Sequence, residues 1–269
     1  MVYDYIYGSK MNFIDFHCHL DYKEFDNNRK AIVEECFNSG FAKIVTVADP
    51  YEEGSYERTI ELLQSNKNVH FMAAAHPHKA DIYTHEIEKG ILKFITDNQA
   101  IGYGEAGLDF HYNLSTPENQ QAVFKRQIAI ANELKLPLII HSREAEPMVL
   151  KFIEEAKFDL PVVFHCYTGN KEDAEEILKR GYYISISGIV TFKNVEFLRD
   201  IVKMIPLNRI FIETDSPYLS PVPFRGQTNT PLRVTLVAEK VAEIKGISIE
   251  QLNQCINGNF NRVIPKFSS

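Results

Sequence analysis

Two histidines separated by one residue, His17 and His19, end a mostly apolar stretch near the start of the chain. Side chains of a strand alternate between its two faces, so both imidazoles point the same way while Cys18 points the other way. Two imidazoles on one face of a strand can bind one metal ion. A chance His-x-His is the competing interpretation, and the choice depends on whether other strands end in further ligands.

Four more ligand-type side chains each follow an apolar segment that is predicted to be a strand: Glu105, His141, His165 and Asp215. Four histidines and two carboxylates are too many for one tetrahedral metal site, and they suit two neighbouring divalent ions. Glu105 is the candidate bridge, because a carboxylate has two oxygens and can contact both metals. Asp215 is a candidate to bind metal and to take the proton from the attacking water.

The elements that would position these residues are strands alternating with helices. Strands are predicted at 13–20, 43–47, 69–74, 100–104, 136–140, 160–164, 182–186 and 209–212, and helices at 27–40, 56–65, 87–97, 115–135, 144–156, 171–180, 195–204, 232–245 and 248–257. Strict alternation predicts parallel strands with helical crossovers. Eight units predict an α/β fold, a (β/α)8 TIM barrel, in which chemistry occurs at the carboxyl ends of the strands. An open doubly wound sheet is the alternative, but no G-x-G-x-x-G follows the first strand.

We expect a single domain at 11–269, with 1–10 as an N-terminal extension outside the fold. No run of about 18 apolar residues predicts a membrane span, and the start of the chain lacks the pattern of a secretory signal. Four cysteines without a C-x-x-C pair predict reduced thiols and a cytoplasmic location. A net charge of −7 argues against a broad basic surface that grips nucleic acid, but not against phosphate held through metal ions.

Several short motifs occur in order along the chain. They are Phe16-His17-Cys18-His19-Leu20, His76-Pro77-His78, Gly104-Glu105-Ala106-Gly107-Leu108-Asp109, His141-Ser142-Arg143-Glu144-Ala145, Phe164-His165-Cys166-Tyr167-Thr168-Gly169, Ser187-Gly188-Ile189-Val190-Thr191-Phe192, Glu213-Thr214-Asp215-Ser216-Pro217-Tyr218-Leu219 and Pro221-Val222-Pro223-Phe224-Arg225-Gly226. With these motifs, the chain from Met11 resembles the TatD family of metal-dependent deoxyribonucleases. Two departures are Ala75, where glycine is common, and Asn229-Thr230-Pro231, where Asn-Glu-Pro is usual.

The resemblance implies the same six metal-site residues: His17, His19, Glu105, His141, His165 and Asp215. It also implies hydrolysis of DNA phosphodiester bonds, often as a 3′-5′ exonuclease, here expected at single-stranded ends. Two divalent ions are the expected cofactors. Histidine ligands suit Zn2+, whereas carboxylates and phosphate suit Mg2+ or Mn2+. DNA is the expected partner, with no membrane and no obligate protein partner.

Other residues near these motifs have two interpretations each. His76 is a candidate for substrate binding from the family pattern, and His78 is equally well a turn residue. Arg143 and Arg225 could each hold a phosphate through forked hydrogen bonds or form an ordinary surface ion pair. Loop aromatics could stack on bases, although loop packing is the commoner role; they are Tyr167, Tyr218 and Phe224. Asp15 is expected inside the barrel, and Cys18 and Cys166 are expected to be small core residues.

Two other functions fit part of the pattern. A barrel metallohydrolase that acts on an amide, a lactone or a small phosphoester would use similar ligands. Glu105 stands at the end of the fourth strand, where no lysine is available for carboxylation, and this favours the nuclease. A non-catalytic binding scaffold is the third hypothesis, which the complete ligand set disfavours.

Overall fold

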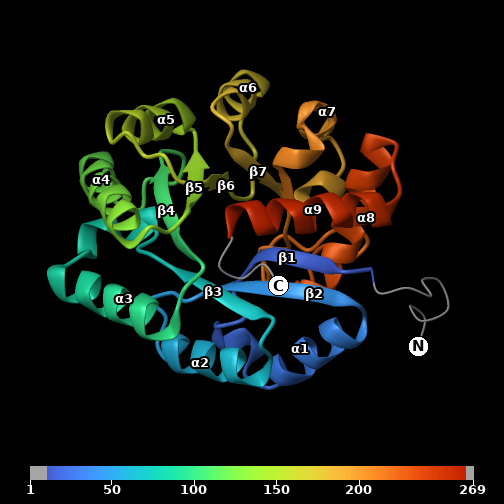
Figure 1. Ribbon diagram of the computed structural model, residues 1–269, viewed down its shortest axis with the longest axis horizontal. Coiled ribbons are helices and arrows are strands. Elements are labelled where there is room, and N and C mark those ends of the chain that lie inside the picture. The colour runs from blue at the N-terminus through green and yellow to red at the C-terminus, as the bar shows by residue number, and fades with distance from the viewer. Residues whose placement is uncertain (1–10, 265–269) are drawn as a thin grey trace.

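Eight parallel strands form one sheet whose strand order follows the chain from β1 to β8. The strands are β1 (Phe13–Cys18), β2 (Phe41–Val47), β3 (Val69–Ala73), β4 (Gly102–Asp109), β5 (Leu138–Arg143), β6 (Val162–Phe164), β7 (Tyr183–Ile186) and β8 (Ile210–Ile212). In Figure 1 the helices lie around the strands, as the predicted (β/α)8 barrel requires. This computed structural model describes residues 11–264, so the extension predicted at 1–10 lies outside the described residues.

The described residues form nine α-helices, most of which cover the outer face of the sheet (Figure 1). They are α1 (Arg29–Asn38), α2 (Ser55–Ser65), α3 (His85–Asn98), α4 (Pro117–Leu134), α5 (Glu146–Glu155), α6 (Lys171–Lys179), α7 (Glu196–Met204), α8 (Val234–Lys245) and α9 (Ile249–Val263). Their start signals work as predicted in α4, where the Thr116 side chain accepts a hydrogen bond from the Asn119 amide and Pro117 occupies the first turn. Between residues 11 and 264, no helix is both long and apolar enough to cross a membrane. The cytoplasmic location stays a prediction.

The barrel closes between β8 and β1 through the turn that follows β8. The Asp215 amide donates to the His17 carbonyl at 2.9 Å, and the His19 amide donates to the Ser216 carbonyl at 2.7 Å. Fully buried Asp15 accepts hydrogen bonds from the amide and the hydroxyl of Thr214, at 2.9 and 2.5 Å. Asp15 therefore points into the barrel, as predicted, and fixes this turn against β1. We call this contact the β8–β1 junction.

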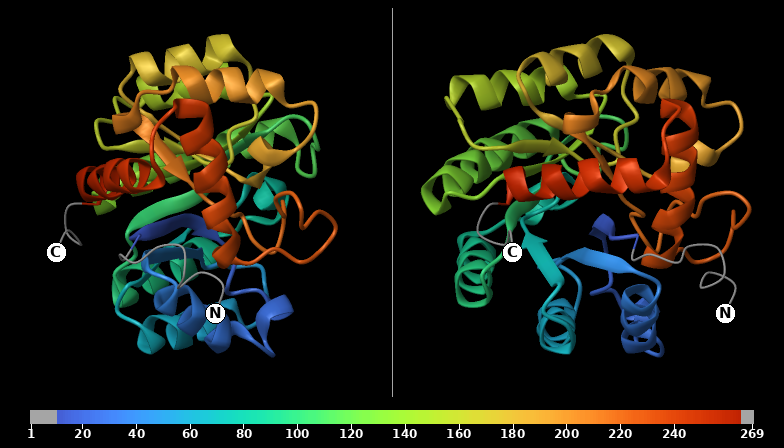
Figure 2. Two further views of the ribbon diagram at one scale, coloured as in Figure 1. Left: turned by 90° about the vertical axis from the view of Figure 1, so that its right-hand side faces the viewer. Right: turned by 45° about the vertical axis from the view of Figure 1, so that its right-hand side comes forward.

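Helix α9 packs at the amino-terminal ends of the same two strands. The Asn259 side chain donates to the carbonyls of Leu207 and Ile210, and the Asn253 side chain donates to the Met11 carbonyl. Figures 1 and 2 show α9 running across this side of the barrel. The sequence predicts that this helix ends at residue 257. That prediction was wrong, since the contacts of Asn259 and burial of Phe260 extend the helix to Val263.

Strand β4 runs from Gly102 to Asp109 and not from 100 to 104, and β5 ends at Arg143 and not before His141. Glu105 and His141 consequently lie within strands rather than after them. Gly107 has φ +152°, and a Cβ at this position would lie 1.8 Å from the His141 carbonyl oxygen. Only glycine permits this close approach. The prediction that this strand ends at Gly104 was wrong because the close approach to β5 at Gly107 continues the pairing to Asp109.

Candidate metal centre

A cavity of about 490 Å³ opens at the carboxyl ends of the strands. Its lining includes five of the six predicted metal-site residues, namely His19, Glu105, His141, His165 and Asp215. The sixth, His17, is fully buried behind the lining, and its Nε2 lies 3.4 Å from Glu105 Oε2. The fold thus brings all six predicted residues together.

Glu105 lies at the centre, and its two carboxylate oxygens face two different groups of histidines. Oε2 lies 3.4 Å from His17 Nε2 and 3.9 Å from His19 Nε2. Asp215 Oδ1 lies on the same side, 3.7 Å from His17 Nε2 and 3.4 Å from His19 Nε2. Residues from β1, β4 and the turn after β8 thus form one ligand group.

The other oxygen of Glu105 faces residues that follow or end three further strands. Oε1 lies 2.6 Å from His165 Nε2, 2.9 Å from His141 Nδ1 and 3.2 Å from His76 Nε2. The imidazoles of His17 and His165 stack with their centroids 4.1 Å apart, so the two ligand groups adjoin each other. A carboxylate between two ligand groups has the geometry of a bridge between two ions.

Two carboxylates behind the histidines were missed by the sequence analysis. Glu213 Oε1 lies 3.3 Å from His165 Nδ1, and Asp109 Oδ2 lies 3.0 Å from His141 Nε2. Metal-binding histidines commonly have such a carboxylate on the second ring nitrogen, where it fixes the orientation and tautomer of the imidazole. The available signal was position, because both residues belong to motifs that also contain a predicted ligand.

The carboxylates and the histidines of the site shift one another's pKa values toward the charged forms. Burial raises the pKa of Glu105, but His165 and His76 outweigh it and hold the pKa well below its ordinary value. Burial likewise lowers the pKa of His165, yet Glu105 and Glu213 raise it well above the ordinary value. Burial also raises the pKa of Asp215, but His19, His17 and His165 together outweigh it and lower this pKa below its ordinary value. The raised pKa of His165 means that a metal ion competes with a proton for this histidine and releases the proton on binding.

The residues present fit divalent cations. His17 Nδ1 and Nε2 and His19 Nδ1 are buried without a hydrogen-bond partner, and such nitrogens are costly unless a ligand satisfies them. Potential ligand atoms lie within 4.8 Å of one another in two sets that share Glu105: His17, His19 and Glu105 form one, and Glu105, His141 and His165 form the other. Histidine and carboxylate donors are the ligands that divalent metals take in proteins.

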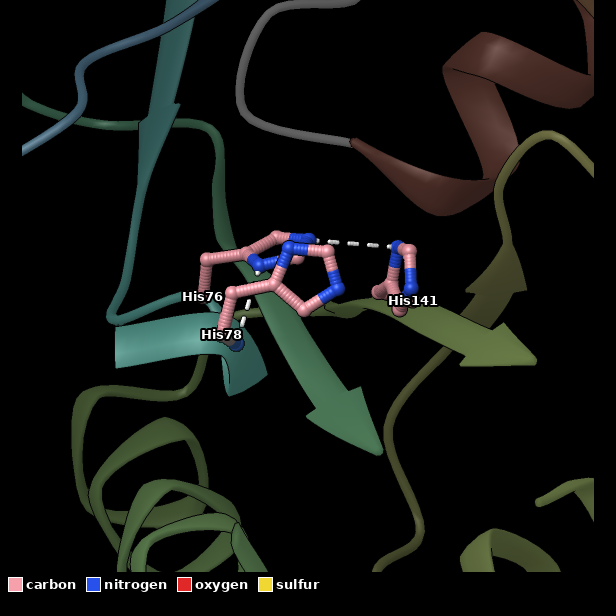
Figure 3. Close-up of side chains that lie close together, drawn as sticks. All are labelled: His76, His78 and His141. Carbon is pink, nitrogen blue, oxygen red and sulfur yellow. Dashed lines mark hydrogen bonds between the residues drawn. The ribbon is translucent and has the colours of Figure 1, made fainter. Parts of the chain in front are cut away.

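His76 and His78 extend this cluster toward the cavity mouth. Figure 3 shows both side chains projecting from the start of the 3-10 helix η2 (Pro77–Ile82) toward His141. His76 Nε2 lies 3.3 Å from His141 Nδ1, and His76 Nδ1 accepts from the His78 amide. His78 Nε2 lies 2.8 Å from Asp109 Oδ2. His78 therefore belongs to the same network and is more than a turn residue.

The two predicted phosphate-binding arginines have different positions. Arg143 lines the cavity, and its guanidinium lies 5.2 Å from the centroid of the Tyr112 ring. Arg225 is exposed, stacks at 3.7 Å on the ring of Phe192 and is not among the described residues that line the cavity. The fold thus brings Arg143 to the site and leaves Arg225 outside the cavity wall.

The predictions for the two cysteines and for the three loop aromatics have different outcomes. Cys18 is buried as predicted, but Cys166 is half-buried and lines the cavity. That prediction was wrong because β6 ends at Phe164, so strand alternation no longer decides where Cys166 points. Tyr167 is buried, and its hydroxyl donates to the Asn170 carbonyl, which is a packing role. Phe224 packs against the Arg233 guanidinium, whereas Tyr218 lines the cavity.

Replacing Glu213 with glutamine is expected to lower metal affinity or activity by about 10- to 100-fold, as is typical for carboxylates behind ligand histidines. The amide keeps the shape but no longer stabilises His165 by charge. Activity measured against metal concentration would show a midpoint shifted to higher metal. Glu172→Gln, an exposed carboxylate on α6, is the control and should leave the midpoint unchanged. An unshifted midpoint in Glu213→Gln would contradict this role.

The barrel and the ligand groups at its carboxyl end define the class: a metal-dependent hydrolase. The model of the family described as TatD related DNase matches residues 14–265. The metal-dependent hydrolase YcfH of Escherichia coli is 37% identical over 260 residues, covering 94% of this chain and 96% of YcfH. The 3′-5′ ssDNA/RNA exonuclease TatD of Enterobacter lignolyticus is 31% identical over 245 residues, covering 89% and 94%. This chain belongs to the TatD family of metal-dependent hydrolases.

The solved structure of YJJV, a TatD homologue from E. coli, has the same fold. It superposes with a TM-score of 0.84 at 24% identity and covers 96% of this chain and 99% of YJJV. This structure confirms the predicted barrel, and the family model with the E. coli YcfH match confirms the predicted family.

Proposed function

We propose that this hydrolase is a deoxyribonuclease that cleaves phosphodiester bonds at single-stranded ends of DNA in the 3′ to 5′ direction. The position of Glu105 carries the proposal, because its two oxygens face two ligand groups as a bridge between two ions would. Paired metals are a common arrangement for phosphodiester hydrolysis. The family description and the name of the Enterobacter relative support a nucleic acid substrate.

We assign two divalent ions, Mg2+, Mn2+ or Zn2+, to the two ligand groups. His17, His19 and Asp215 would hold the first ion and His141 and His165 the second, with Glu105 shared between them. When bound, such ions stabilise charge on phosphoryl oxygens and lower the pKa of water. The protein would supply the remaining groups, one to accept the proton of the attacking water and others to bind the substrate phosphates.

Asp215 is the residue that we assign to the proton of the attacking water. Its Oδ1 faces His17 and His19, and we assign the proton to Oδ2. The pKa of Asp215 lies below its ordinary value, so the carboxylate is ionised and can accept a proton. Hydrogen bonds from its amide to His17 and from the Tyr218 amide to its carbonyl fix the turn that carries it.

Arg143 and His76 are the residues that we assign to the substrate phosphates. The Arg143 guanidinium lines the cavity and makes no hydrogen bond or ion pair with the described residues, which leaves its donors for a forked contact with phosphate. Among the described residues, Lys79 also lines the cavity and adds positive charge. Arg225 stays a predicted phosphate-binding residue, for a substrate long enough to extend beyond the cavity.

The test is hydrolysis of a 5′-labelled single-stranded DNA with added Mg2+, Mn2+ or Zn2+. We expect a ladder of products shortened from the 3′ end, with no products in the presence of EDTA. Parallel assays should use single-stranded RNA, duplex DNA and panels of amides, lactones and small phosphoesters. Hydrolysis confined to those small molecules would replace the nuclease proposal with the alternative metallohydrolase.

A further inference from the structure

Two exposed tyrosines lie at the mouth of the metal-site cavity. Only six large apolar or aromatic side chains are strongly exposed among residues 11–264: Ile82, Tyr112, Leu114, Phe197, Tyr218 and Val222. Tyr112 and Tyr218 are 55% and 53% exposed, and both line the cavity. Each therefore presents an aromatic surface to whatever occupies the site.

The backbone of Tyr218 is fixed although its ring is exposed. The Tyr218 amide donates to the Asp215 carbonyl at 2.9 Å, and its carbonyl accepts from the Asn229 side chain at 2.7 Å. The ring lies 6.2 Å from the imidazole of His19 and 6.3 Å from the ring of Tyr22, in edge-on contacts. Tyr218 is thus held beside the residue assigned to the proton.

Tyr112 is held in a comparable way by the other ligand group. Its amide donates to Asp109 Oδ1 at 2.8 Å, and its ring meets His78 edge-on at 5.8 Å. The Arg143 guanidinium lies over the ring at 5.2 Å. The backbone of each exposed tyrosine is thus hydrogen-bonded to an aspartate of the metal centre, Tyr112 to the Asp109 carboxylate and Tyr218 to the Asp215 carbonyl, unlike aromatics that only fill loops.

The two rings belong to opposite parts of the barrel. Tyr218 follows β8, which adjoins β1, whereas Tyr112 follows β4, which pairs with β5. The ligand groups lie between these parts of the barrel end. A chain whose phosphodiester lies at Glu105 would extend toward both rings, one on each side of the bond that is cut.

From this arrangement we propose that Tyr112 and Tyr218 are base-stacking subsites for the nucleotides on either side of the scissile phosphate. The inference rests on the proposed nuclease function. Every nucleobase has a π-face, so stacking binds single strands without regard to sequence. A net charge of −7, with Lys79 and Arg143 as the lysine and arginine of the cavity wall, limits the affinity that phosphate contacts alone supply. Stacking provides the remaining affinity and favours unpaired bases over duplex.

The test compares Tyr112→Ala and Tyr218→Ala with Tyr112→Phe and Tyr218→Phe. All are made in an Asp215→Asn background so that the strand is not cut. The probe is a single-stranded hexadeoxynucleotide with 2-aminopurine at the last or the penultimate position, titrated in Mg2+. Binding should quench the fluorescence, and each alanine variant should weaken binding about five- to a hundredfold and reduce the quenching at one probe position. The phenylalanine variants, which keep the ring, should behave like the parent.

Phe197→Ala is the matched control, because Phe197 is 51% exposed on α7 and does not line the cavity. It should bind the probe like the parent. Equal affinity and equal quenching in all tyrosine variants would overturn the stacking inference while the nuclease proposal stands. If the unaltered protein cuts no DNA with any added metal, it is the nuclease proposal that fails. The two failures are therefore distinguishable.

Discussion

Replacing Glu105 with glutamine is expected to reduce hydrolysis of single-stranded DNA by about a thousandfold or more. The carboxylate is the group shared by both ligand sets, 2.6 Å from His165 Nε2 on one side and 3.4 Å from His17 Nε2 on the other. Its loss removes the single negative charge that the two proposed ions would share, and metal ions contribute several kcal/mol to such reactions. The measurements are kcat/KM and the metal content of the purified variant.

Glu144→Gln is the matched control for this substitution. Glu144 carries an exposed carboxylate at the same end of the barrel and pairs with His111 at 2.6 Å, outside the metal centre. We expect activity and metal content close to those of the unaltered protein. Two bound ions and full activity in Glu105→Gln would rule out the bridging role.

Replacing Asp215 with asparagine is expected to lower kcat by about 10²- to 10⁴-fold, the usual contribution of a general base. Asparagine keeps the size of the side chain and the backbone hydrogen bond to His17, so the turn should remain folded. The expected readout is a low kcat with an unchanged thermal midpoint of unfolding. Because Asp215 also faces the first proposed ion, the variant should need a higher metal concentration to reach half of its maximal activity.

Asp200→Asn serves as the control, since Asp200 lies on the exposed face of α7 and pairs with Lys203 at 2.8 Å. It should leave kcat unaltered. If Asp215→Asn retains full kcat at saturating metal, the proton must go to another group. Loss of folding in the same variant would show up as a lowered thermal midpoint and would point to a structural role at the β8–β1 junction.

The barrel was predictable because its strands are nearly all apolar. In β1 every residue is buried, as expected for a parallel sheet with helices on one face and a filled interior on the other. That continuous burial produces recognisable apolar runs, and the ligand types come at or near the end of each run. All six ligands could therefore be found from local sequence with the rule that barrel sites lie at carboxyl ends.

The extent of the strand that carries Glu105 could not be predicted in the same way. This strand contains Gly102, Gly104 and Gly107, and its pairing with β5 is irregular between Tyr103 and Ala106. The reason for the glycines is the close approach of the neighbouring strand, which is a tertiary contact. Local propensity has no information on such contacts.

Asp109 and Glu213 were missed for a related reason. A sequence shows that a carboxylate follows a strand, but not whether it faces a metal or the back of a histidine. Asp215 has φ +53° in the turn after β8, and this turn directs it to His19 while Glu213 stays behind His165. The position of Arg225 likewise depends on the path of a long loop, which no periodicity encodes.

The β8–β1 junction links the chemistry of the site to the integrity of the ring. Between residues 11 and 264, each other neighbouring pair of strands is joined by a ladder, whereas this pair meets through the turn that carries Asp215 and through His17 and His19. A cation held by these three residues would span both ends of the sheet. By linkage, the free energy of binding this cation would stabilise the closed barrel. We expect a chelator to remove the cation and to speed hydrogen exchange at the amides of His19 and Asp215 more than at the amides of the laddered strands.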